Sequence, residues 1–338
     1  MNIFSMDEWE STPSLLELIQ STYKICHFAW YRKPEGRETL LASLNTDLNS
    51  MSQVTYNEVI LLVATAVAFT IFRKILTKCL LTPMAKWLKL DENNVVKFPE
   101  SGWKFMIHGG LWLYTFYILM LSGRHQFFHR PSTVWDGWSM DMEIQRDIYV
   151  IYVLEGAYYL HGLYALFFYD LRRKDRQVMV AHHVICVFLL WLSYVQRCHN
   201  VGILVVFLHD VSDILLELVK IFVLLRSRQG IYYRVWGILA LIFFALLIIS
   251  WALTRLYYYP FKAIYATSGI LLDTSNMAVL GSCSVFMILM LYVIFIMDLY
   301  WFGIITAILY KSLRGTLKNG VDDIREEDVA YQEVKKGN

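Results

Sequence analysis

Two long apolar segments of the sequence contain ionisable side chains, and these are the residues best suited to chemistry. The first segment holds the histidine pair His182 and His183. The second holds a cluster of ionisable groups, namely His209, Asp210, Asp213, Glu217 and Lys220. An ionisable group inside a membrane-spanning helix costs several kcal/mol unless it is paired or faces water. We therefore expect a functional site at these two segments.

The spacing in the second segment places its acidic groups together. Asp210, Asp213 and Glu217 stand at i, i+3 and i+7, so they share one face of a helix. On that helix His209 can pair with Asp213, and Lys220 can pair with Glu217. A short connection joins the two segments, which makes them antiparallel neighbours whose polar faces can meet.

These residue types suit nucleophilic and acid–base catalysis. A neutral His serves as a general base or nucleophile near pH 7, and a carboxylate orients it and stabilises its charged form. His and carboxylates also bind iron or zinc, but the nine histidines include no H-x-x-H pair. We therefore predict a catalytic or ligand-binding site without a metal. The alternative is that these groups only hydrogen-bond helices to one another.

The composition places the site in a membrane protein. Of the 338 residues, 57% are hydrophobic and only 18% are charged, and the mean hydropathy is +0.43. Roughly a quarter of the residues of a soluble domain are charged, so this chain has too little polar surface for water. The same numbers exclude a disordered chain. The five cysteines form no C-x-x-C pair, which argues against a disulfide framework or a zinc site.

Seven segments are long and apolar enough to cross a bilayer, which needs about 20 residues as a helix. The predicted fold is therefore an all-α polytopic membrane protein. The predicted spans are Val59–Leu76, Phe105–Leu121, Ile148–Tyr169, Val178–Val195, Val201–Leu225, Val235–Leu253 and Ala278–Tyr310. The third span adds Glu155 and His161 to the ionisable groups, and the fourth adds the polar residues Ser193 and Tyr194.

The distribution of basic residues predicts the orientation. About twice as many Lys and Arg fall on the side of the first loop and the C-terminus, which places that side in the cytosol and the N-terminus in a lumen or outside. The chain ends with Lys335 and Lys336 before its last two residues, a dilysine pattern typical of retrieval to the endoplasmic reticulum. The segment Leu15–Tyr31 has helical spacing and could lie on the membrane or pack on the bundle.

The segment 171–224 resembles the Lag1 motif of ceramide synthases, which lies inside their TLC domain. The matching residues are Arg172, Arg173, Lys174, Asp175, Met179, His182, His183, Ser193, Tyr194, Gly202, His209, Asp210, Asp213, Glu217 and Lys220. The segment 99–105 looks like the start of the TLC domain, and Arg255-Leu256-Tyr257 also matches. The chain looks most like the ceramide synthase type without a homeobox-like domain, because its first predicted cytosolic loop is too short to hold one.

Three features depart from the family pattern. Arg176 replaces an aromatic residue, Asp298 stands where an Asn is expected, and the segment Gly269–Ser282 matches poorly. That last segment is associated with acyl-chain preference in the family, so its poor match leaves the chain length open. The resemblance as a whole points to a stearoyl donor.

The resemblance implies a TLC-type bundle with an internal substrate tunnel and N-acylation of a sphingoid base by a fatty acyl-CoA. The acyl-CoA is a co-substrate, no cofactor is expected, and the other partners are membrane lipids and no nucleic acid. A dimer with a second copy or with another ceramide synthase stays open. The implied division is 1–57 as a lumenal segment, 58–98 as the first span and a basic loop, 99–311 as the TLC domain and 312–338 as a cytosolic tail.

The resemblance also implies roles for individual residues. His182 or His183 removes a proton from the sphingoid ammonium, or one of them attacks the thioester and forms an acyl-imidazole. Asp210 and Asp213 orient a histidine and attract the ammonium, and His209 relays a proton.

Other residues are expected to bind the substrates. The loop residues Arg172, Arg173 and Lys174 attract the phosphates of coenzyme A, or they only set the orientation of the chain. The remaining candidates for substrate binding are Glu155, His161, Ser193, Tyr194 and Glu217. The alternatives to an enzyme are a non-catalytic TLC-type lipid-binding or lipid-regulating protein and a heptahelical receptor.

Overall fold

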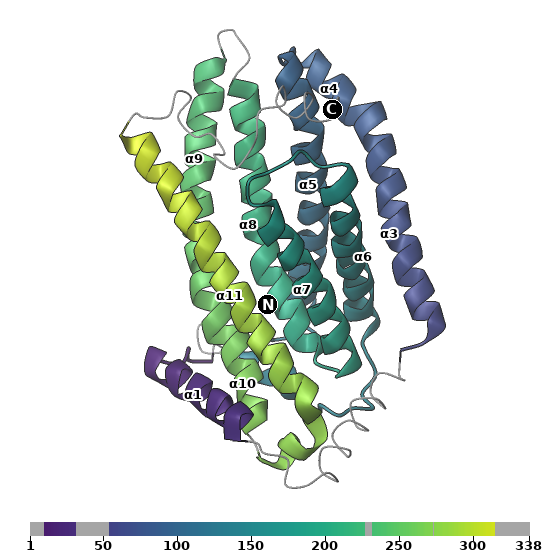
Figure 1. The fold of residues 1–338 in the computed structure, drawn as a ribbon, viewed down its shortest axis with the longest axis vertical. Helices are drawn as coiled ribbons and strands as arrows, with labels where there is room; N and C mark the ends of the chain where they lie inside the picture. Colours follow the sequence, from purple (N-terminus) through teal and green to yellow (C-terminus); the bar gives the residue numbers. More distant parts are fainter. Residues whose placement is uncertain (1–9, 32–53, 227–231, 273, 315–338) are drawn as a thin grey trace.

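The computed structural model describes residues 10–31, 54–226, 232–272 and 274–314, and these residues form helices and connecting loops without a β-strand (Figure 1). The α-helices are α1 (Leu15–Tyr31), α3 (Tyr56–Leu76), α4 (Thr82–Trp87), α5 (Glu92–Phe116), α6 (Arg146–Phe168), α7 (Arg176–Val195), α8 (His199–Arg226), α9 (Tyr233–Trp251), α10 (Tyr265–Leu272) and α11 (Thr274–Leu313). The tail with Lys335 and Lys336 lies outside the described residues.

Three wider, π-helical segments continue these helices, and one short 3₁₀ turn lies in a loop. They are η2 (Thr77–Leu81), η3 (Tyr117–Leu121), η5 (Ala252–Ile264) and the 3₁₀ turn η4 (Pro131–Trp135). The segment η5 contains Pro260, which has no N–H to donate, so a regular α-helix could not continue through it unchanged. π-helical turns often occur at functional sites, and η5 carries Arg255.

Helix α3 begins with a capping box that is visible in the sequence. The hydroxyl and backbone N–H of Thr55 donate to the Glu58 carboxylate at 2.9 and 2.7 Å, and the Glu58 N–H donates to the Thr55 hydroxyl at 3.3 Å. These bonds satisfy backbone N–H groups that have no partner inside the helix. Ser14 and Glu17 make the same arrangement at the start of α1.

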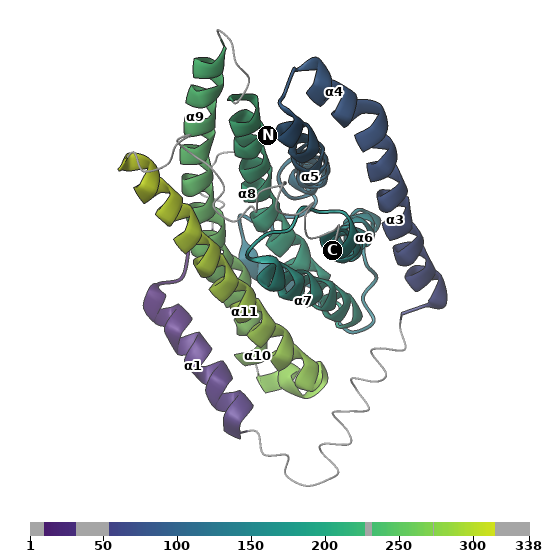
Figure 2. The ribbon, with the colours of Figure 1, turned by 45° about the horizontal axis from the view of Figure 1, so that its top comes forward.

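Helix α8 occupies the centre of the bundle. It contacts α5, α6, α7, α9 and η5, whereas α3 stands at one edge against α6 (Figures 1 and 2). The long helix α11 crosses the face formed by α7 and η5. The helix richest in ionisable groups is therefore shielded from lipid by its neighbours, which removes most of the cost of placing charges there.

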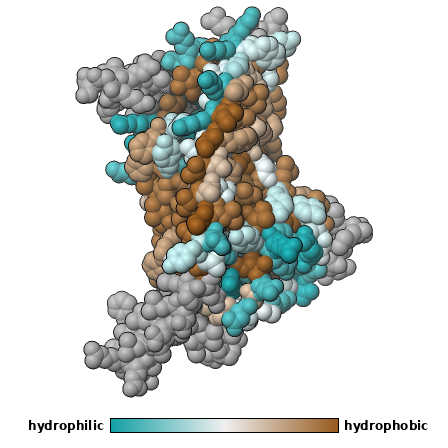
Figure 3. Space-filling view, turned by 90° about the vertical axis from the view of Figure 1, so that its right-hand side faces the viewer, coloured by the Kyte–Doolittle hydropathy of each residue, from teal (hydrophilic) through white to brown (hydrophobic). Residues whose placement is uncertain are grey.

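The surface confirms a polytopic membrane protein. On the face shown in Figure 3, hydrophobic residues cover the middle, and hydrophilic residues gather towards the two ends. Five helical stretches in the described part of the chain are apolar and long enough to span a membrane: Tyr56–Trp87, Arg146–Phe168, Arg176–Val195, Arg234–Ser268 and Phe286–Leu313. Helices α5 and α8 are also long, but they carry several charges, so the count of seven spans stays a prediction.

Helix α1 packs on the bundle and also leaves an apolar face outward. It contacts α10, and the hydroxyls of Thr22 and Tyr292 lie 2.5 Å apart. Leu15, Leu16 and Ile19 on its other side are each more than half exposed. Packing on the bundle is therefore the placement found for this segment.

Candidate active site

A cavity lined by many polar side chains opens between α5, α6, α7, α8 and α11, and we call it the polar cavity. Its walls include the side chains of His108, His161, His182, His183, Asp213, Glu217 and Arg255. Arg73, Lys104 and Arg173 line it towards the end of the bundle that carries α4 (Figure 1). The polar faces of α7 and α8 thus meet inside the bundle, as the sequence predicted.

A second, apolar cavity lies next to the first. It lies between α7, α8 and α11, on the side of the last turns of α7. The residues that line it are mostly apolar, namely Cys186, Leu189, Leu190, Ser193, Cys198, Val201, Gly202, Val205, Val206, His209, Met287, Leu291 and Ile294, together with Tyr159 and His182. Tyr159 and His182 line both cavities. The junction between a polar and an apolar space therefore falls at His182.

The two neighbouring histidines have different surroundings. The His182 ring packs edge-on to Trp301 with centroids 5.2 Å apart, and its Nε2 lies 3.5 Å from the Cys186 thiol. His183 donates from Nδ1 to the backbone carbonyl of Met179 at 2.8 Å, which leaves its Nε2 without a proton when the ring is neutral. His182 thus reaches both cavities, whereas the carbonyl contact fixes the orientation of His183.

Gly162 gives His183 the room that it occupies. A Cβ at this position would lie 2.7 Å from two ring atoms of His183. We predict that Gly162→Ala displaces the ring and lowers kcat by about 10²-fold, because a shift of about 1 Å in an active site has that effect. Gly303→Ala is the control, since a Cβ there meets no atom within 4 Å. Equal kcat values for the two variants in a steady-state assay would contradict the tight contact.

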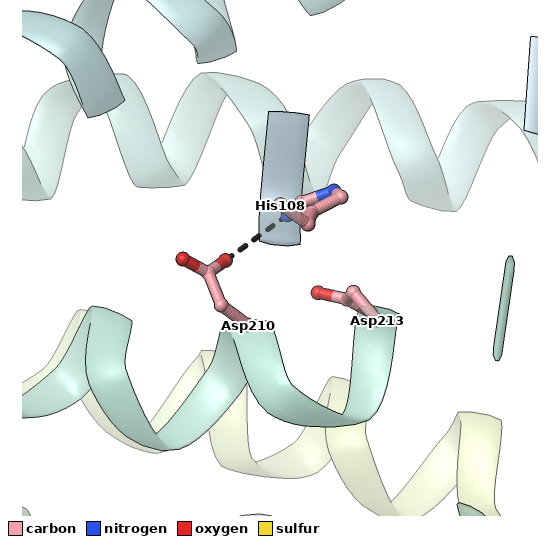
Figure 4. Close-up of side chains that lie close together, drawn as sticks. All are labelled: His108, Asp210 and Asp213. Carbon is pink, nitrogen blue, oxygen red and sulfur yellow. Dashed lines mark hydrogen bonds and ion pairs between the residues drawn. The ribbon is translucent and has the colours of Figure 1, made fainter. Parts of the chain in front are cut away.

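Asp210 contacts a histidine that the sequence analysis missed. Its carboxylate lies 3.1 Å from Nδ1 of His108 on α5 (Figure 4). Nε2 of His108 lies 2.9 Å from the Tyr158 hydroxyl. The histidine beside Asp210 therefore comes from α5 and is neither His182 nor His183, and the orienting role of Asp210 stays a prediction. His108 lies inside the predicted span Phe105–Leu121, so the rule applied to the other ionisable residues would have found it.

Asp213 and His209 do not form the expected pair. The Asp213 carboxylate accepts a bond from Arg255 at 2.7 Å. His209 donates from Nδ1 to the Val205 carbonyl at 2.8 Å, and its Nε2 lies 3.1 Å from Asp298. Both ring nitrogens of His209 therefore have partners other than Asp213.

Arg255 ties this network together from η5. Its guanidinium donates to Asp298 at 3.0 Å, to the Ser212 hydroxyl at 2.6 Å and to the His209 carbonyl at 2.9 Å, besides Asp213. The side chain is 3% exposed and lies over the Trp251 ring at 4.0 Å. A buried guanidinium between two carboxylates needs most of its donors satisfied, and this one has them.

Cations line the polar cavity near its α4 end. Lys104 contacts Asp170 at 2.8 Å and Glu100 at 2.6 Å, and Arg73 contacts Asp170 at 2.6 Å. Burial alone would raise the pKa of Asp170, in the loop after α6, but Lys104 and Arg73 hold it well below its usual value. Arg173 lines this end and contacts Asp175 at 3.1 Å, and Arg172 and Lys174 are exposed.

The remaining candidates divide between the cavities and their surroundings. His161 lines the polar cavity and contacts the Thr70 hydroxyl at 2.9 Å; Ser193 lines the apolar one, 3.0 Å from the Tyr152 hydroxyl. Lys220 donates to Glu217 at 3.0 Å, as predicted. Tyr194 lies outside both cavities and donates to Glu58.

Glu155 also lies outside both cavities, next to Asp210. It is 1% exposed and lies near Asp210. The ligand atoms of His108, Asp210 and Asp213 lie within 4.8 Å of one another, so a cation could also be held there (Figure 4). The prediction of no metal stays a prediction.

Comparison with known proteins identifies the family. Residues 97–307 match the TLC domain. The chain is 39% identical to human (Homo sapiens) ceramide synthase 1 over 81% of its length and 77% of the relative, and 36% identical to the mouse (Mus musculus) protein of the same name over 82% and 78%. It is 30% identical to Arabidopsis thaliana ceramide synthase LOH2 over 78% and 88%. The chain therefore belongs to the ceramide synthase family of TLC-domain proteins and is a membrane acyltransferase.

Proposed function

We propose that this protein transfers a fatty acyl group from acyl-CoA to the amine of a sphingoid base, giving ceramide or dihydroceramide. The observation that carries the proposal is the meeting of a polar and an apolar cavity at His182. Acyl-CoA is divided in the same way, because its thioester joins an apolar hydrocarbon chain to a polar, charged nucleotide carrier. The named activity of the similar ceramide synthases agrees with it.

The cavities determine how the donor would lie. The hydrocarbon chain would enter the apolar cavity along α7, which has 13 residues beyond His182 and therefore extends roughly 20 Å from it at about 1.5 Å per residue. The length of the acyl chain is taken from the family resemblance, which points to a stearoyl donor. The phosphates of coenzyme A would lie among Arg73, Lys104 and Arg173 at the other end.

Two routes for the transfer fit this placement. In one route His182 takes the proton from the sphingoid ammonium, and the free amine attacks the thioester directly. In the other, His182 attacks the thioester, releases coenzyme A and forms an acyl-imidazole, which the amine then displaces. Asp213 lines the polar cavity and would attract the ammonium. A ping-pong steady-state pattern would favour the second route.

The proposed site also has a proposed location. The distribution of basic residues supports a cytosolic α4 end of the bundle, on the side where acyl-CoA is dissolved, and a lumenal N-terminus. The dilysine sequence Lys335 and Lys336 supports residence in the endoplasmic reticulum. Dimerisation with itself or with another ceramide synthase is compatible with this arrangement.

The test is a transfer assay with the purified protein. Sphinganine and stearoyl-CoA are added in detergent micelles or liposomes, and N-stearoyl sphinganine is measured by mass spectrometry against a series of acyl-CoA chain lengths. We expect product from stearoyl-CoA with a preference over shorter and longer donors. Absence of any N-acylated base from the folded protein would favour a non-catalytic lipid-binding protein or a receptor.

The loop before α7 provides a second test. We predict that Arg173→Ala combined with Lys174→Ala raises KM for acyl-CoA about 3–10-fold, because each partly exposed charge contributes up to about 1 kcal/mol. KM for sphinganine should change by less than about two-fold, since that substrate has no phosphates. Arg146→Ala, exposed at the opposite end of the bundle, is the control. A parallel rise in both KM values would argue against phosphate binding.

A further inference from the structure

Tyr159 occupies the junction of the two cavities together with His182. It lies on α6, is 9% exposed, and packs edge-on to both histidines, with ring centroids 6.2 Å from His182 and 5.5 Å from His183. Within the described residues, Tyr159 and His182 are the two side chains that line both the polar and the apolar cavity. A thioester carbonyl placed beside His182 would therefore lie beside Tyr159 as well.

The hydroxyl of Tyr159 differs from those of the other deeply buried tyrosines. Tyr152, Tyr158 and Tyr259 each have a hydrogen bond to an oxygen or nitrogen atom of the protein at 2.8–3.0 Å. In the described part of the chain, the Tyr159 hydroxyl has no such bond, and its partner is the weakly accepting thiol of Cys186. Because sulfur is a weak acceptor, the carbonyl oxygen of a ligand can replace it as the partner of this hydroxyl.

We propose that the Tyr159 O–H donates a hydrogen bond to the carbonyl oxygen of the acyl group while it is transferred. This inference rests on the proposed function. When a nucleophile attacks the thioester carbon, the π electron pair of the carbonyl moves onto its oxygen. Tyr159 stabilises that oxyanion and keeps its own proton. The pair then returns to the carbonyl, the C–S bond breaks, and the coenzyme A thiolate leaves with the proton given up by the nucleophile or by His182.

The other donors around the polar cavity are less suitable. Tyr158 is bonded to His108, Trp301 donates from Nε1 to Asp175 at 3.2 Å, and Arg255 is held by its two carboxylates. None of the three lines the apolar cavity. An acyl chain that occupies the apolar cavity has its carbonyl at the junction, where Tyr159 is the available O–H donor.

The test replaces one oxygen atom. Tyr159→Phe keeps the ring and its packing but removes the hydroxyl, and we expect kcat to fall by about 10²–10³-fold, the usual effect of losing one oxyanion donor. KM for acyl-CoA and for the sphingoid base should stay within about two-fold, because the bond forms fully only in the transition state. Tyr164→Phe, on the exposed side of the same helix, is the matched control and should keep the wild-type kcat.

A second measurement separates donation from packing. Incorporation of 3-fluorotyrosine at position 159 makes the phenol a stronger donor with almost the same shape, and kcat should rise above that of the natural residue at a pH where both phenols are neutral. The inference is overturned if Tyr159→Phe keeps kcat, or if it raises KM without lowering kcat. If Tyr159→Phe does not fold, an unchanged kcat with fluorotyrosine overturns it. An inactive wild-type protein would instead refute the proposed function.

Discussion

His182→Ala is expected to lower kcat for acyl transfer by about 10³-fold or more while the protein still inserts and folds. His182 lines both cavities, so in either proposed route its imidazole would meet the thioester or the attacking amine. Loss of a general base alone lowers the catalysed rate by about 10²–10⁴-fold, and loss of a nucleophile lowers it by at least as much. The measurement is the steady-state rate of ceramide formation at saturating concentrations of both substrates.

The neighbouring histidine provides a graded comparison. His183→Ala should lower kcat less than His182→Ala, by about 10²-fold, because His183 is fixed to the Met179 carbonyl and acts on the position of its neighbour. His27→Ala, on the exposed side of α1, is the control and should match the wild type. Wild-type rates in both His182→Ala and His183→Ala would exclude histidine catalysis here.

Arg255→Leu is expected to destabilise the protein by about 3–5 kcal/mol, because it leaves the fully buried Asp298 and the partly buried Asp213 without their cation. Asp213 also lines the polar cavity, so its displacement should abolish transfer. The measurement is thermal unfolding in detergent together with the transfer rate. Reduced yield of folded protein would be the first sign.

Matched variants isolate the cause of that loss. Arg124→Leu removes a half-exposed guanidinium that contacts Asp147 at 3.0 Å. Exposed ion pairs contribute only about 0–1 kcal/mol to the free energy of unfolding, so this variant should be nearly as stable as the wild type. Asp298→Asn should be tolerated far better than Arg255→Leu, since an amide oxygen still accepts from Arg255 and removes one buried charge. If Arg255→Leu unfolded at the same temperature as Arg124→Leu, the network would be of no consequence for stability.

The sequence predicted the elements that place the site. Long apolar runs with few breaks can only be helices in lipid, so α6, α7 and α9 were found directly. The short connection between α7 and α8 forced those helices to be neighbours, which brought His182 and Asp213 to one cavity. The pair of Glu217 and Lys220 also followed, because both residues lie on one helix.

Contacts between distant segments could not be predicted in the same way. His209 and Asp213 have the right spacing to pair, but Arg255 and Asp298 approach from η5 and α11 and offer stronger partners. Helical spacing describes a single helix and contains no information on which side chains its neighbours present. His108 was within reach of the sequence argument, but its pairing with Asp210 depends on how α5 packs on α8.

The most direct measurement is a structure of the protein with a non-transferable acyl-CoA analogue, a thioether in place of the thioester. We predict the sulfur atom beside His182, the hydrocarbon chain in the apolar cavity that ends near Ser193 and Cys198, and the phosphates near Lys104 and Arg173. A chain bound on the lipid-facing surface, or a sulfur atom remote from His182, would contradict the account.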